Sequence, residues 1–227
     1  MNSASGKRKK ESGAATKTTK VPVQPKEALR QEVAEVYRRA IFDAAERVFG
    51  AHGFAEAKMT EIAEGAGLSA GSLYNHFTNK EEIFSALVEH RSGAFLQELN
   101  DATHLEGDLE SLLTALVKRT FCELDAHGAF FALLMQGGGV GNHSQRACGP
   151  MFERNHQRFL GAFESVFRRA AGKGDLAPGY APDELAAVLA GSAHGVAMAW
   201  LQGGRKTKIT ERAEQLVRLF LNGAKTR

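Results

Sequence analysis

The segment from Thr60 to Phe84, TEIAEGAGLSAGSLYNHFTNKEEIF, constrains the fold of this chain more than any other stretch. Ile62, Ala63 and Ala66 have the spacing of the inner face of a short helix. Gly67 follows, and a residue without a Cβ atom can adopt the positive φ that a sharp break requires. The pattern therefore predicts a short helix that ends in a tight turn.

A second short helix is predicted from Ala70 to about His76, with Ser69 as its N-cap and Leu73 and Phe77 facing inward. Its outward face begins with small residues and continues with polar and aromatic donors: Ala70, Gly71, Ser72, Tyr74, Asn75 and His76. Small residues let a helix approach another surface closely, and the donors can then bind it. This is the layout of a helix-turn-helix, whose second helix enters the DNA major groove.

Two stretches, AIFDAAERVFGAHGF (40–54) and IAEGAGLSAGSLYNHFTNKEEIF (62–84), resemble the TetR family of bacterial one-component transcription regulators. The resemblance depends on the order and spacing of AA-x-x-x-F-x-x-x-G, IA-x-x-AG-x-S, G-S-L-Y-x-H-F and NK. One position departs from the family, which usually has Thr or Ser where this chain has Lys58. Either Thr60 caps a slightly shorter helix, or the cap is missing at a cost of about 1 kcal/mol.

The resemblance implies an all-α fold, with an N-terminal three-helix helix-turn-helix domain and a C-terminal helical domain for ligand binding and dimerisation. We expect a disordered basic tail at 1–30, the DNA-binding domain at 31–95 and the second domain at 96–227. The implied function is a homodimeric repressor that binds an inverted-repeat operator in double-stranded DNA and is released by a small apolar ligand. No cofactor is expected, and the effector is not identified by the sequence.

The resemblance also implies which residues contact DNA. Tyr74 and Lys80 stand where the family contacts the phosphate backbone, and Asn75 can read adenine through its amide. Thr60 is open between a DNA contact and a helix cap. The full predicted DNA-binding set is Thr60, Ser69, Ala70, Gly71, Ser72, Tyr74, Asn75, His76 and Lys80.

Apolar residues at helical spacing fill the second half of the chain, and many of them are Phe or Met. Such a stripe forms either a packed core or the wall of an effector cavity, and for each single residue both readings stay open. Ligand sites are mostly apolar with a few placed polar groups, so His156 and its neighbour Asn155 are the polar candidates. The predicted ligand-binding set is Phe121, Phe131, Met135, Phe152, His156, Phe159 and Phe163.

Small residues recur every four positions near the C-terminus, where they allow two helices to approach closely. The last helix has a broad apolar face. In the family the last two long helices pair across a two-fold axis, although the same pattern also suits packing inside one subunit. The predicted dimer interface is Ala187, Gly191, Gly195, Ala199, Leu216, Val217 and Phe220.

The net charge of +3 conceals an uneven distribution. Residues 1–30 hold eight Lys or Arg and two Glu, whereas residues 31–95 hold six Lys or Arg and ten Asp or Glu. An acidic domain is unusual for a protein that relies on attraction to phosphates. The basic tail is therefore either a solvated leader or an arm that supplies positive charge to DNA.

Several other classes of protein are disfavoured. Residues 185–201 are apolar but short for a membrane span and rich in Ala and Gly, so we expect a buried helix and no membrane contact. The N-terminus lacks the apolar segment of a secretory signal, and two cysteines, Cys122 and Cys148, make no disulfide framework, which points to the cytoplasm.

Catalysis is not expected, because the chain has no nucleophile motif and no metal-binding pair such as H-E-x-x-H. No metal site is predicted. Two alternatives to the inducible repressor stay open: a DNA-binding protein of the same fold without an inducer, with an architectural role, and a Cys/His sensor of metal or redox state.

Overall fold

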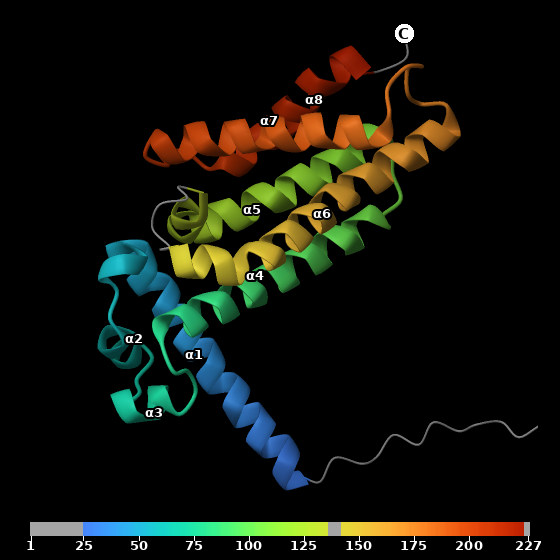
Figure 1. The fold of residues 1–227 in the computed structure, drawn as a ribbon. Coiled ribbons are helices and arrows are strands. Elements are labelled where there is room, and N and C mark those ends of the chain that lie inside the picture. The colour runs from blue at the N-terminus through green and yellow to red at the C-terminus, as the bar shows by residue number, and fades with distance from the viewer. Residues whose placement is uncertain (1–24, 136–141, 225–227) are drawn as a thin grey trace, which may run out of the picture. The chain divides into compact units, whose positions relative to one another are not determined.

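The computed structural model describes residues 25–135 and 142–224, without the side chains of Pro25, Leu133, Met135, 142–148 and 223–224. In chain order the elements are α1 Pro25–Glu56, α2 Met59–Gly65, α3 Ala70–Tyr74, α4 Lys80–Thr103, α5 Leu109–Met135, α6 Asn142–Lys173, α7 Pro182–Gln202, the 3₁₀ helix η1 Ile209–Arg212 and α8 Ala213–Ala224 (Figure 1). The predicted all-α fold class is confirmed.

Helix α1 begins at Pro25, so the last residues assigned to the tail, 25–30, are helical instead. Most of the predicted tail, residues 1–24, lies outside the described residues. Residues 25–36 belong to a separate compact unit, in which every described side chain is exposed. At the other end of α1, Gly53 has a φ of 76° and a ψ of 168°, which breaks the helical geometry there.

The helix-turn-helix region, from the second part of α1 to the start of α4, has its own buried core. Large residues from α1, α2, α3 and α4 fill it, among them Phe42, Phe49, Ile62, Leu73, Ile83 and Phe84. Phe130 of α5 and Met151 of α6 also belong to this core. The predicted division at residue 95 therefore does not separate two cores, since α4 runs through it and α5 and α6 complete the first core.

The second core lies among α4, α5, α6, α7 and α8, which lie alongside one another in Figure 1. Leu113, Phe121, Phe163, Phe167 and Leu189 are fully buried in it. The Nε1 atom of the chain's single tryptophan, Trp200, donates to the carbonyl of Thr207 at 2.6 Å, which ties the end of α7 to the loop before η1. Asp125 accepts from the backbone N–H groups of Ile209 and Thr210 and so caps η1.

Helix α7 has one buried face and one exposed face. Among the described helices it alone is long and apolar enough to cross a bilayer by length and composition. Leu185, Leu189, Ala193, Ala197 and Trp200 are nevertheless buried in the second core. The expectation of a buried helix thus holds for one face of α7, whereas the opposite face is open and carries Val188, 58% exposed.

Candidate functional site

Helices α2 and α3 and the turn between them form the geometry that the sequence predicts. Gly67 has a φ of 69°, a conformation in which a Cβ atom would be strained. Ser69 caps α3, since its Oγ accepts from the backbone N–H of Ser72 at 3.1 Å. Helix α3 ends at Tyr74, earlier than expected, and Asn75 and His76 follow in a turn.

The start of α2 resolves the question raised by Lys58. Lys58 is the N-cap in extended conformation and its side chain caps nothing, but its backbone N–H donates to Glu61 at 3.3 Å. Half of a capping box therefore remains. Thr60 lies inside the first turn with its side chain exposed, so it is not the cap.

The predicted DNA-binding residues of this region lie on one continuous segment and reach solvent. Ser69, Gly71, Tyr74, Asn75 and His76 are exposed, whereas Ala70 and Ser72 are half-buried. Tyr74 is the large aromatic residue among them and is 52% exposed. The ring of His76 lies 6.0 Å from that of Tyr37 on α1, which orients it.

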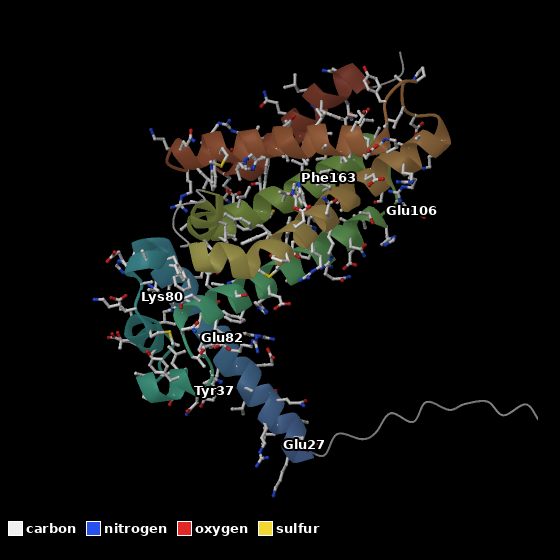
Figure 2. The ribbon with its side chains drawn as sticks, in the orientation of Figure 1. Glu27, Tyr37, Lys80, Glu82, Glu106 and Phe163 are labelled. Atoms are coloured by element: carbon white, nitrogen blue, oxygen red, sulfur yellow. The ribbon has the colours of Figure 1, made fainter. Side chains whose placement is uncertain are left out.

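Lys80 departs from its predicted role as a contact to the DNA backbone. Its Nζ donates to the carbonyl oxygens of Phe54 at 2.9 Å, Ala55 at 2.6 Å and Ala57 at 3.2 Å. It also lies 5.0 Å from the centre of the Phe54 ring. An ammonium group has three N–H donors, and all three are used inside the protein. Lys80 therefore fastens the start of α4 to the end of α1 (Figure 2).

The first turn of α4 is fixed by a further set of bonds. Asn79 is the N-cap of α4, and its side chain accepts from the backbone N–H of Glu82 at 2.8 Å. Glu82 completes the turn differently from a capping box, because its carboxylate accepts from the N–H and the hydroxyl of Thr78 at 2.7 and 2.8 Å. The Thr78 backbone bond lowers the pKa of Glu82. The position of α4 relative to α3 is thus specified by local hydrogen bonds.

A cavity of about 600 Å³ lies among α4, α5, α6 and α7. Four residues of the predicted ligand-binding set line it: Phe131, Phe152, His156 and Phe159. Asn155 lines it too. The volume and the mostly apolar wall with a few polar groups match the general character of small-molecule sites.

Two residues of the predicted ligand-binding set lie outside this cavity. Phe121 and Phe163 are fully buried in the second core and do not line the cavity. Both side chains pack in that core, and the ring of Phe163 also lies 5.1 Å from that of Phe159, one turn earlier on the same helix. Met135 ends α5, and its side chain lies outside the described part of the structure.

Sequence reasoning missed the part of the wall contributed by α4 and α7. From α4 come Val88, Arg91, Ser92, Phe95 and Leu96, and from α7 come Ala187, Ala190, Gly191, Ala193, His194 and Ala197. The signal available in the sequence was a charged residue, Arg91, within an otherwise apolar helical stripe. Ala187 and Gly191, predicted as dimer contacts, border the cavity as well.

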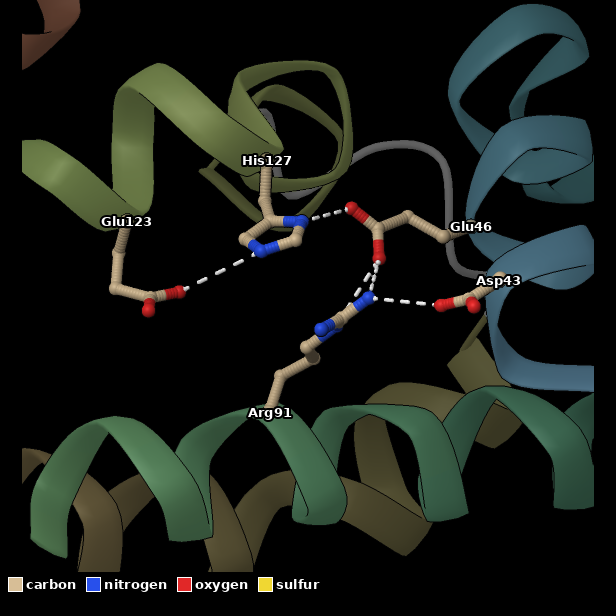
Figure 3. A network of polar contacts seen from close by, with 5 residues as sticks. All are labelled: Asp43, Glu46, Arg91, Glu123 and His127. Carbon is tan, nitrogen blue, oxygen red and sulfur yellow. Dashed lines mark hydrogen bonds and ion pairs between the residues drawn. The ribbon is translucent and has the colours of Figure 1, made fainter. Parts of the chain in front are cut away.

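Two charged residues of the cavity wall, Arg91 and Glu123, belong to a network of polar contacts (Figure 3). Arg91 donates to Glu46 of α1 at 2.7 and 3.0 Å and to Asp43 at 3.2 Å. The other oxygen of Glu46 lies 2.5 Å from Nδ1 of His127 on α5. The Nε2 atom of His127 is 3.9 Å from the carboxylate of Glu123. Arg91 and Glu123 both line the cavity, so the network extends from its wall to α1.

The two carboxylates in this network are perturbed in opposite directions. Burial tends to raise the pKa of Glu46, but the bond to His127 and the charge of Arg91 outweigh it, so that the pKa lies below its ordinary value. Burial raises the pKa of Glu123 above its ordinary value, and the attraction of His127 only partly offsets this. Glu46 is thus a satisfied anion, whereas Glu123 ionises at a cost.

The cavity and the helix-turn-helix core share side chains. Val88 and Phe130 belong to that buried core and also line the cavity. The ring of Phe130 lies 5.9 Å from that of Phe84. Helices α1 and α5 approach so closely that a Cβ atom on Gly50 would lie 3.0 Å from the Cβ of Ala129. Side chains of the cavity wall are therefore in direct contact with the residues that pack α1 against α4.

The predicted dimer contacts divide into two groups. Ala187, Gly191, Gly195 and Ala199 are exposed on α7 and available to a partner. Leu216 and Val217 are buried in the second core, and Phe220 packs against Phe167 at 5.7 Å, so these three are occupied within the subunit. The apolar face of α8 turns inward, and its exposed apolar residue is Leu219, at 72%.

Comparisons with known proteins agree with this architecture. Residues 41–87 match the family described as bacterial regulatory proteins, tetR family. The probable HTH-type transcriptional regulator ArpR of Pseudomonas putida is 36% identical over 100 residues, which cover 41% of this chain and 45% of the relative. The helix-turn-helix region of this chain is thus similar to that of TetR-family regulators. The HTH-type regulator TtgR of Pseudomonas putida is 35% identical over the same shares of the two chains.

Solved structures extend the similarity over most of this chain. The SmeT–triclosan complex aligns with a TM-score of 0.70 and 25% identity over 84% of this chain and 92% of SmeT. The fatty acid degradation regulator FadR of Bacillus halodurans has a TM-score of 0.72 at 23% identity, over 84% of this chain and 97% of FadR. The sequence matches to ArpR and TtgR, by contrast, span less than half the length of those relatives.

Proposed function

We propose that this chain is a homodimeric, cytoplasmic transcriptional repressor that leaves its operator when a small, mainly apolar molecule fills the cavity among α4–α7. The observation that carries the proposal is the shared wall: Val88 and Phe130 line the cavity and are buried in the helix-turn-helix core. A ligand that displaces either side chain acts directly on the packing that positions α4.

Proteins of the same fold support both parts of this proposal, repression and the binding of a small-molecule effector. SmeT is described as the repressor of the multidrug efflux pump SmeDEF of Stenotrophomonas maltophilia, and one of its structures holds triclosan. FadR of Bacillus subtilis, which shares the fold at a TM-score of 0.70 and 18% identity, was crystallised with stearoyl-CoA. A repressor with an effector cavity is therefore a function that this fold supports.

On the DNA side we assign recognition to α3 and the turn that follows it. Tyr74 is the expected phosphate contact and Asn75 and Ala70 the residues that select bases, with Ser72 and His76 as further donors. Lys80 is left out because its ammonium group is saturated by backbone carbonyls. In a dimer, two such helices about 34–36 Å apart would fit successive major grooves of an inverted repeat.

For the dimer we propose the exposed face of α7. Ala187, Gly191, Gly195 and Ala199 allow a partner helix to approach closely, and Val188 adds exposed apolar surface. Leu219 of α8 is a further apolar residue available for the contact.

Coupling between cavity and DNA would run through α4 and α1. Lys80 fixes the first turn of α4 to α1, and Arg91 fixes its middle to α1 through Glu46. A ligand that moves Phe95 or Arg91 changes the angle between α4 and α1, and with it the position of α3. A coupling free energy of about 1–3 kcal/mol suffices for such a switch.

The direct test selects operator fragments from a random DNA pool with the purified full-length protein and then measures affinity by gel shift. We expect an inverted repeat bound by a dimer, and weaker binding after addition of an apolar ligand that raises the melting temperature. A protein that sediments as a monomer at micromolar concentration would contradict the dimer. If no cavity ligand changes the operator affinity, the result would favour the alternative hypothesis of a DNA-binding protein without an inducer.

The sensor alternative has less support. Among the described residues, no group of three or more His, Cys, Asp or Glu side chains is arranged to hold a metal ion. Cys122 is a free, exposed thiol, and the side chain of Cys148 lies in the part that is not described.

A further inference from the structure

The two charged residues in the cavity wall, Arg91 and Glu123, differ in how completely their charges are paired with opposite charges. Arg91 is the only Arg or Lys among the described lining residues, and Glu123 is the only Asp or Glu. The guanidinium of Arg91 already bonds to the carboxylates of Glu46 and Asp43. Its positive charge is therefore neutralised from the side of α1, and an anionic ligand would have to compete with two carboxylates for it.

Glu123 has no comparable partner. The nearest basic atom paired with it is Nε2 of His127, at 3.9 Å, which is beyond hydrogen-bond distance. The other nitrogen of that ring is held by Glu46. Two further carboxylates, Glu98 and Glu46, repel the Glu123 charge, while Arg91 and His127 attract it. The wall thus carries an incompletely balanced negative charge at a half-buried position.

The rest of the wall is suited to a cation as well. Phe95, Phe130, Phe131, Phe152 and Phe159 line the cavity. The rings of Phe95 and Phe159 lie 6.1 Å apart. Aromatic faces carry negative electrostatic potential, so they attract a desolvated cation and repel an anion. The ring-lined wall and the Glu123 carboxylate therefore both favour a cationic ligand over an anionic one.

We propose that the effector is an amphipathic cation, whose apolar body lies among the phenylalanine rings of the cavity and whose ammonium group pairs with the carboxylate of Glu123. This inference rests on the proposed effector cavity and specifies the class of molecule that fills it. Glu123 lies on α5 beside His127, which contacts Glu46 of α1, so a cation at this carboxylate binds at the end of the network that reaches the DNA-binding region (Figure 3).

The test uses three probes with the same alkyl chain and different head groups: decylammonium, 1-decanol and decanoate. Each is titrated calorimetrically into the full-length protein at neutral pH and below its micellar concentration. We expect decylammonium to bind most tightly and decanoate least. Glu123→Gln keeps the shape and removes the charge, and it should weaken decylammonium about ten-fold while changing decanol by less than about two-fold.

Glu98→Gln is the matched control. Glu98 is half-exposed, pairs with Arg119 at 2.7 Å and does not line the cavity, yet its charge influences Glu123. If direct pairing with Glu123 holds the ammonium, Glu98→Gln should change the decylammonium affinity far less than Glu123→Gln. Equal effects of the two substitutions would show that only the general negative field matters and would overturn the assignment to Glu123.

The remaining outcomes separate this inference from the proposed function. Tightest binding of decanoate, or unchanged decylammonium affinity in Glu123→Gln, would overturn the cationic effector and leave the cavity itself in place. Failure of all three probes to bind would contradict the effector cavity and the inference with it. Decylammonium should also weaken operator binding by the wild type, and less so by Glu123→Gln.

Discussion

Glu46 of α1 and His127 of α5 are joined by a contact of 2.5 Å between Oε1 and Nδ1, across 81 residues of sequence. His127 is also the point at which the backbone of α5 leaves helical geometry, with a φ of −124°. The other oxygen of Glu46 accepts from Arg91 of α4. One carboxylate therefore holds together three helices, one from the DNA-binding region and two from the cavity wall (Figure 3).

Glu46→Gln should lower the free energy of unfolding at neutral pH by about 1–3 kcal/mol, because Arg91 and His127 lose a charged partner while they stay partly buried. The pKa of Glu46 is held below its ordinary value of 4.5, so its ionisation stabilises the folded state above that pH. This stabilisation disappears as the pH falls through the lowered pKa. Urea unfolding of wild type and variant across this pH range measures the difference, which should shrink on acidification.

Glu123→Gln is expected to behave in the opposite way and serves as the contrast. Burial raises the pKa of Glu123, so its ionisation costs stability once the pH exceeds the ordinary value of 4.5. The variant should be more stable than the wild type at neutral pH and equally stable below that value, where both folded and unfolded states are protonated. A loss of stability at neutral pH would show that Glu123 has a structural partner.

Lys80→Met tests whether this lysine binds DNA or holds the fold. The substitution leaves three carbonyls of the α1 terminus without a charged donor, and we expect a loss of about 1–3 kcal/mol in the free energy of unfolding. The slope of log affinity against log salt should not change. A phosphate contact would instead reduce that slope by about 1. Fluorescence anisotropy with a labelled operator at several salt concentrations distinguishes the two.

Phe159 and Phe163 provide a matched pair one helical turn apart on α6. Phe163 is fully buried in the core, so Phe163→Ala should cost about 3–5 kcal/mol of stability. Phe159 is half-buried and lines the cavity, so Phe159→Ala should weaken ligand binding at a smaller cost in stability. Thermal unfolding and calorimetric ligand titration of both variants check this. Equal losses of stability in the two would place Phe159 in the core.

The helix-turn-helix was predictable because its determinants are local. Gly67, Ser69 and Asn79 act on backbone groups within a few residues, so their spacing alone specifies the turn and the two helix starts. The inner positions, such as Leu73 and Phe77, follow from helical periodicity. The turn, the helix starts and the inward-facing positions could therefore be predicted, because each depends on residues that are close in sequence.

The cavity and the proposed dimer face were harder to predict because both depend on which side of a helix meets which partner. Phe159 and Phe163 share one apolar stripe, yet only the former lines the cavity, and no property of the stripe separates them. The broad apolar face of α8 has the same pattern whether it faces a partner or the core, and Leu216 and Val217 face the core. The bonds of Lys80 within the protein could not be predicted because its three acceptors are backbone carbonyls, which sequence does not distinguish.

Tyr74 and Asn75 are adjacent and exposed, and the proposed binding mode gives them different tasks. Tyr74→Ala removes a phosphate donor, which should weaken binding to every sequence by roughly ten-fold or more, since a hydrogen bond to a charged group contributes about 1.5–3 kcal/mol. Asn75→Ala should instead relax the preference at one base pair by about 1–3 kcal/mol. Neither substitution should alter thermal unfolding, because neither side chain is buried. Competition binding with operators mutated one position at a time separates the two effects. A Tyr74→Ala protein that binds DNA like the wild type would show that α3 meets the duplex through a different face.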